Sequence, residues 1–96
     1  MNIEETITRA RDLRHEDELE ASQALLLDLL DAHPDNPLVL YEVGGSYDVL
    51  GEEKDAIPYY RQALDAGLSG NDRLECMVCL GICYRNIGQF ARAVDA

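Results

Sequence analysis

Two helices folded tightly onto one another are predicted by residues 40–63, which read LYEVGGSYDVLGEEKDAIPYYRQA. Apolar residues recur there at the three-and-four spacing that places them on one helix face, first before and then after Gly51. Because glycine readily takes the positive φ found just past a last helical turn, we expect Gly51 to separate the two helices. Helices joined so briefly must lie antiparallel. Gly44 costs the first helix up to about 1 kcal/mol relative to alanine, so its presence indicates a close contact between the two backbones.

The same pattern returns 37 residues later, with Gly81 in the place of Gly44. The matched pairs are Leu40 and Met77, Val43 and Leu80, Gly44 and Gly81, Tyr47 and Tyr84, Leu50 and Ile87, Gly51 and Gly88, and Ala56 and Ala93. Counting about 34 residues back from the middle copy gives an earlier, weaker copy, in which Thr6 and Arg9 stand where large apolar residues belong. Terminal repeats often have a more polar outer face, so this departure is expected at the end of an array.

This repeated pattern resembles the tetratricopeptide repeat, a helix–turn–helix unit, and residues 63–72 and 84–88 further resemble small bacterial proteins of that family of uncharacterised function. The resemblance implies an all-α fold, a right-handed α-solenoid of antiparallel helix hairpins with about two and a half units and five to six helices. We expect one domain over residues 1–96, with repeats at about 3–36, 37–70 and an incomplete 74–96. The expected helices span about 3–15, 18–32, 37–50, 53–66, 71–87 and 90 onward.

Short polar residues indicate where three of these helices begin. Asn2 and Asp17 are each followed by a glutamate three positions later, which is the spacing of an N-cap and its acidic partner. Asn36 is followed by a proline, which is favoured at the first helical position.

The third copy presents an apolar face around Leu80, Gly81 and Tyr84 that the residues after it cover only in part. An uncovered apolar patch is unfavourable in a soluble monomer. We therefore expect either a natural chain that continues beyond Ala96 or self-association into a homo-oligomer through this incomplete C-terminal repeat.

An excess of acidic residues gives the chain a formal charge of −11, from 19 Asp and Glu against 8 Lys and Arg. Phosphate backbones and anionic membranes repel such a charge, so neither nucleic acid nor a membrane is an expected partner. Residues 1–14 lack the apolar core of an export signal, and no run is long enough to span a bilayer. Three cysteines, an odd number, fit free thiols in a reducing cytoplasm, where we expect the protein to reside.

The resemblance also implies that the first helices of successive repeats line a concave groove that receives a peptide or an extended segment of a partner protein. The principal hypothesis is therefore a non-catalytic scaffold for a protein or peptide partner that the sequence does not identify. Carried over by repeat alignment, the groove residues are Ile7, Arg11, Arg14, Tyr41, Gly45, Asp48, Val78, Ile82 and Arg85. The Lys, Arg and Asn set with which some members bind a C-terminal carboxylate is not present, because Gly45 and Ile82 occupy two of its places. Each groove residue has an alternative role in packing between neighbouring helices.

Cys76, Cys79 and Cys83 share one helical stripe, which leaves open a thiol-based redox or metal sensor. The favoured interpretation is that they are small core residues, because cysteine is among the most often buried residue types. Structural self-association is a further alternative. We expect no cofactor, no resident metal and no enzyme activity, since the sequence has no glycine-rich phosphate loop, nucleophile elbow or HExxH run.

Overall fold

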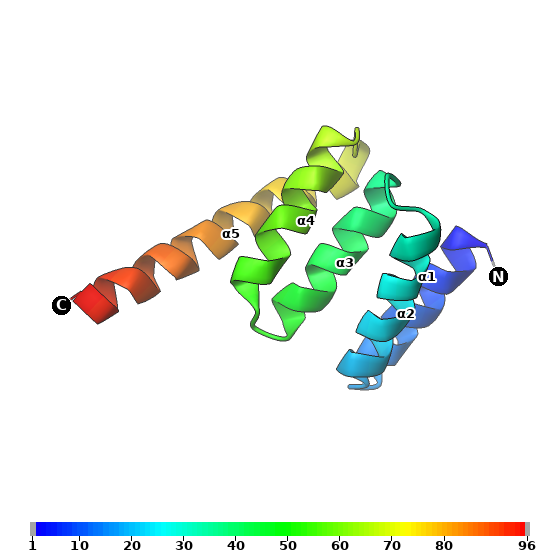
Figure 1. The fold of residues 1–96 in the computed structure, drawn as a ribbon, viewed down its shortest axis with the longest axis horizontal. Coiled ribbons are helices and arrows are strands. Elements are labelled where there is room, and N and C mark those ends of the chain that lie inside the picture. Colours follow the sequence, from blue (N-terminus) through cyan, green and yellow to red (C-terminus); the bar gives the residue numbers. More distant parts are fainter. Residues whose placement is uncertain (1, 96) are drawn as a thin grey trace.

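The computed structural model describes the backbone of residues 2–95 and the side chains of residues 2–88. Within these residues the chain forms five α-helices and no β-strand. The helices are α1 (Ile3–His15), α2 (Leu19–Ala32), α3 (Pro37–Val49), α4 (Glu53–Asp65) and α5 (Gly70–Asp95). Short turns join α1 to α2 and α3 to α4, so each pair is an antiparallel hairpin (Figure 1). The all-α array of helix hairpins expected from the repeat is confirmed.

The first four helices begin and end within one residue of their expected bounds, which is within the usual uncertainty of helix ends. Two of the expected caps are confirmed. Asn2 Oδ1 accepts the backbone N–H of Glu5 at 2.8 Å, and Asn36 Oδ1 accepts two backbone N–H groups at 3.0 and 3.2 Å. The cap expected at Asp17 is wrong, because Asp17 takes a φ of 65° in the turn and Glu18 stands directly before α2 without a side-chain cap bond.

Two clusters of buried side chains form the core, and α3 contributes to both. The cluster between α1, α2 and α3 consists of Ile7, Ala10, Leu26, Leu29, Val39 and Val43. The second cluster packs α4 against α3 and α5. It consists of Leu40, Ala56, Tyr60, Ala63, Leu68, Cys76 and Cys83. Val39 and Val43 are four residues apart and point the same way into one cluster, whereas Leu40 follows Val39 by one position, about 100° around the helix, and reaches the other cluster.

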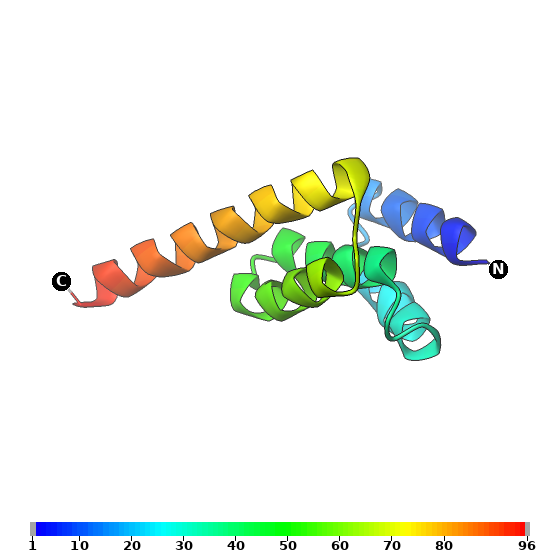
Figure 2. The same cartoon turned by 90° about the horizontal axis from the view of Figure 1, so that it is seen from above.

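The five helices are arranged so that α1 and α5 lie on the same side of the array, with α2 and α4 away from them (Figure 2). Between them, α3 contacts α1 and α5 as well as its neighbours α2 and α4. The first helices of the successive hairpins therefore share one face of the molecule. The C-terminal half of α5 extends beyond the other four helices (Figures 1 and 2).

The helix break expected at Gly88 is wrong, because α5 continues through it to Asp95. The corresponding Gly51 does end α3, with a φ of 78°, and α4 then turns back so that the Tyr60 ring packs on Gly44. Among the described residues, no atom lies within 4 Å of where a Cβ on Gly81, the counterpart of Gly44, would stand. Helices in proteins depend mainly on tertiary packing, and among the described residues the packing of Tyr60 on Gly44 has no counterpart at Gly81 that would stabilise a turn at Gly88. Ala93, the last member of the repeated set, has its side chain outside the described residues.

Candidate peptide-binding groove

A hollow opens between α3 and α5 on the face that these helices share with α1. It has a volume of about 290 Å³ and is lined by Tyr41, Leu74, Glu75, Val78 and Cys79. Leu74 and Val78 are four residues apart, so they stand one above the other on the same face of α5. The Val78 side chain is 61% exposed. The hollow is therefore an open site with largely apolar walls.

A buried glutamate on α3 binds an arginine from α1 beside this hollow. Glu42 is only 4% exposed, and its Oε2 accepts a bond from Arg11 Nη2 at 2.8 Å while its Oε1 accepts from Arg11 Nε at 3.3 Å. This bidentate hydrogen bond is the largest of the effects that raise the pKa of Arg11, and the charges of Glu42, Asp72 and Tyr41 raise that pKa further. The contact fastens α1 to α3 and holds the guanidinium in a defined orientation.

A second arginine of α1, Arg14, approaches the same carboxylate, with its Nη2 3.8 Å from Glu42 Oε1. Its Nε and Nη2 atoms are buried and have no hydrogen-bond partner among the described residues. The guanidinium packs over Gly45, where a Cβ would stand at an ordinary contact distance of 3.8 Å from Nη2. Arg11 and Arg14 therefore share the carboxylate of Glu42, in a chain whose formal charge is −11.

Two tyrosines carry hydroxyl groups bonded to carboxylates along the same face. Tyr41 Oη donates to Glu75 Oε2 at 3.1 Å and so joins α3 to α5, while Tyr60 Oη donates to Asp48 Oδ2 at 2.9 Å. The two rings pack with their centroids 6.0 Å apart. Burial is the largest cause that raises the pKa of each tyrosine, followed by the hydrogen bond to the carboxylate, so both hydroxyls remain donors at neutral pH.

The structure brings four of the residues expected in the groove close to the hollow or to its neighbouring charge cluster. Tyr41 and Val78 line the hollow itself, from α3 and α5 respectively. Arg11 and Arg14 meet at Glu42, the residue next to Tyr41 in α3. These residues come from all three helices of the shared face.

The other expected groove residues are placed differently. Ile7 is 3% exposed and packs in the core between α1, α2 and α3. Asp48 lies on α3 with its carboxylate engaged by the hydroxyl of Tyr60. Ile82 and Arg85 are exposed further along α5, outside the hollow.

Sequence reasoning missed Glu42, the residue that organises the two arginines. A signal for it exists, because Glu42 stands between Tyr41 and Val43 in a helix whose other residues at this level are mostly apolar. A carboxylate in such surroundings needs a hydrogen-bonded cation. Arg11 and Arg14 follow Thr8, the counterpart of Glu42 34 residues earlier, by three and six residues.

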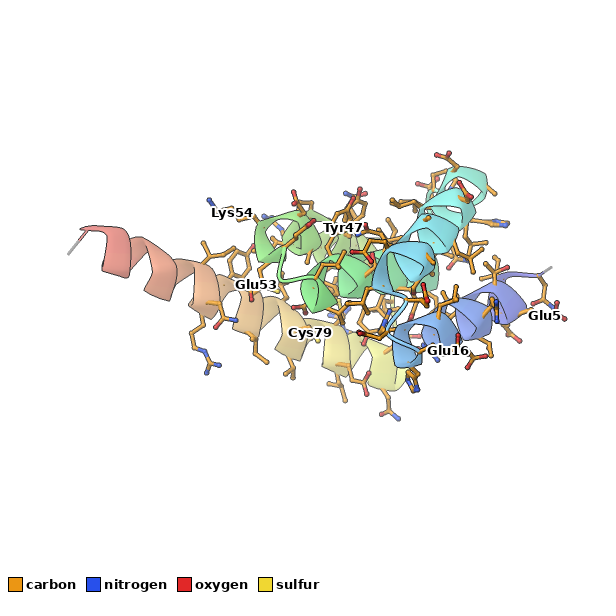
Figure 3. The ribbon with its side chains drawn as sticks, turned by 90° about the horizontal axis from the view of Figure 1, so that it is seen from below. Glu5, Glu16, Tyr47, Glu53, Lys54 and Cys79 are labelled. Carbon is orange, nitrogen blue, oxygen red and sulfur yellow. The ribbon has the colours of Figure 1, made fainter. Side chains whose placement is uncertain are left out.

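The three cysteines lie on the side of α5 that faces the other helices, as Figure 3 shows for Cys79. Cys76 and Cys83 are buried, and Cys76 Sγ donates to the carbonyl oxygen of Tyr60 at 3.5 Å. Burial is the largest cause that raises the pKa of Cys76 and Cys83 to about 11. Thiols with a raised pKa carry little reactive thiolate at neutral pH, so the sensor alternative gains no support here. Among the described side chains, no group of His, Cys, Asp or Glu is arranged to hold a metal ion.

Comparison with known protein families gives a match over the part of the chain that contains α3 and α5, the two helices that line the hollow. The family model described as tetratrico peptide repeat matches residues 37–95, which include α3, α4 and α5 and make up more than half of the chain. No curated protein matches the chain. No helix between residues 2 and 95 combines the length and the apolar composition needed to cross a membrane.

Proposed function

Because the chain belongs to the tetratricopeptide-repeat family, whose members generally mediate protein–protein interaction, we propose that it is a non-catalytic scaffold that holds a peptide segment of a partner protein. The proposed site is the face shared by α1, α3 and α5. The observation that carries the proposal is the open hollow of about 290 Å³ between Tyr41 and Val78. A hollow with apolar walls and a few polar groups at its edge suits an apolar anchor side chain.

The charge cluster beside the hollow gives the proposed ligand a second feature. Within the part of the chain that the structure describes, two buried N–H-bearing nitrogens of Arg14 have no partner, and each missing hydrogen bond costs about 1–3 kcal/mol. A carboxylate or carbonyl oxygen brought within reach by a ligand would offset this cost. We therefore infer that the preferred segment carries an apolar residue near an acidic one, with Asp48, Ile82 and Arg85 extending the contact along α3 and α5. Ile7 is not included, because its side chain is buried.

The test uses peptides selected from a random displayed library on the purified protein and measured by calorimetric titration. Val78→Gln removes an apolar wall of the hollow, and Val49→Gln makes the same change on α3 outside it. The two valines are 61% and 46% exposed, so neither change disturbs the core. We expect Val78→Gln to weaken binding at least about tenfold, the loss of roughly one well-packed apolar contact. Equal binding by both variants would refute the proposed site.

A second candidate function, self-association, is favoured by the exposed apolar residues of α5. Met77 and Tyr84 are among the large hydrophobic side chains that α5 leaves accessible. Contiguous exposed apolar surface commonly marks an interaction site. The molar mass in solution tests this candidate, with a dimer expected and a monomer at all concentrations excluding it.

For both functions we propose the cytoplasm as the site of action, supported by three free thiols.

A further inference from the structure

The outer face of α5 carries a stripe of apolar and small residues, defined here as Met77, Gly81, Tyr84 and Gly88. Their spacing of four, three and four places them on one side of the helix. Met77 is 49% and Tyr84 48% exposed, and both glycines are exposed as well. Among the described residues, no atom lies within 4 Å of where a Cβ on either glycine would stand. The stripe thus alternates large side chains with empty places.

The middle hairpin shows what a face of this kind packs against. Each residue of the stripe lies 37 positions after its counterpart in the middle repeat, so the stripe corresponds to the face of α3 that contains Gly44. On α3 this face is covered by the antiparallel α4, and the ring of Tyr60 occupies the place that a side chain on Gly44 would fill, with Cδ1 only 2.6 Å from an ideal Cβ. A glycine at this repeat position therefore receives a tyrosine ring from an antiparallel helix.

We propose that a second copy of this chain covers the stripe by antiparallel pairing of the two α5 helices. A two-fold axis between positions 82 and 83 sets Gly81 against the partner's Tyr84 and Met77 against the partner's Gly88, because the members of each pair are equally far from the axis. Each large side chain then meets an empty place, and the two-fold repeats both contacts. The inference rests on the proposed self-association and specifies the surface and register that produce it.

Charge also favours α5 as the contact between two copies. The helix contains three acidic residues and three arginines, so the formal charge of −11 belongs entirely to the rest of the chain. Two such acidic bodies repel one another, and the repulsion is least along a segment without net charge. Because the stripe is exposed while Cys76 and Cys83 face the other helices, an antiparallel pair keeps the two bodies on opposite sides of the paired helices.

The test measures the molar mass of the intact chain over a concentration series by sedimentation equilibrium, against a monomer mass of 10.7 kDa. Gly81→Gln fills the place that receives the tyrosine ring and improves local helix propensity, so the monomer should fold at least as well. We expect the unaltered chain to form dimers and Gly81→Gln to raise the dimer dissociation constant by more than about tenfold. Tyr84→Gln, the other half of the same contact, should have a similar effect. Val49→Gln, which alters an equally exposed apolar residue on α3, should not.

The possible results distinguish the pairing of α5 helices from self-association in general and from peptide binding. A chain that stays monomeric at all concentrations overturns both the self-association and the pairing. A dimer that tolerates Gly81→Gln and Tyr84→Gln overturns the pairing and leaves self-association through another surface. Peptide binding in the groove is measured independently and is affected by neither result.

Discussion

Replacing Gly44 by alanine tests the closest contact in the fold. The new methyl group would stand 2.6 and 2.7 Å from two ring atoms of Tyr60, which is 1% exposed and has its hydroxyl bonded to Asp48 at 2.9 Å. The ring cannot move aside without breaking that bond, so we expect an overpacking cost of about 1–3 kcal/mol. Alanine gains up to about 1 kcal/mol of helix propensity over glycine, which offsets part of this cost.

Gly45→Ala, one residue further along α3, is the matched control. A Cβ there meets atoms no nearer than 3.8 Å, an ordinary contact distance. Both variants gain the same propensity, so the difference in their free energy of unfolding isolates the overpacking at Tyr60 and should be about 1–3 kcal/mol. Urea denaturation followed by circular dichroism measures it, and the melting temperatures should differ by at least about 4 °C. If Gly44→Ala proves as stable as Gly45→Ala, the Tyr60 ring does not pack as closely on Gly44 as described.

Two further predictions concern buried ionisable groups. Glu42→Gln removes the charge that Arg11 and Arg14 share and should destabilise the fold by about 1–3 kcal/mol in the same urea assay, whereas an unchanged midpoint would show that the contact contributes nothing. The pKa of Cys76 and of Cys83 is raised from 9.0 to about 11, so the folded state keeps protons that the unfolded state releases. Their contribution to stability is present below about pH 9 and should be lost as the pH rises to about 11. Replacing both by alanine should make the decline between pH 9 and 10, below the ordinary pKa of the buried tyrosines, less steep. An equally steep decline in the double variant would assign it to other groups.

The hairpin of α3 and α4 was the part of the fold most accessible to sequence reasoning. Gly44, Gly51 and Tyr60 act through local spacing, and the structure places them as that spacing predicts. The break expected at Gly88 failed because a glycine permits a turn without imposing one, and the contact that stabilises the turn at Gly51 comes from Tyr60, nine residues further along the chain. Packing partners of this kind are not contained in the local pattern.

The groove was predictable only in part for a similar reason. Repeat alignment placed Tyr41 and Val78 on one face, because equivalent positions of successive helices share a face, and both line the hollow. It placed Ile7 on the same face, although that side chain is buried in the core between α1, α2 and α3. Glu42 was missed because its role depends on where α1 crosses α3, which is set by three-dimensional packing of helices far apart in sequence.

The most direct measurement of the proposed function is a map of amide chemical-shift changes when a library-selected peptide is titrated into the isotopically labelled protein. We expect the largest changes on α1, α3 and α5, centred on Tyr41, Val78 and the arginines around Glu42. Changes centred instead on the outer faces of α2 and α4, with the hollow unaffected, would contradict the proposed site.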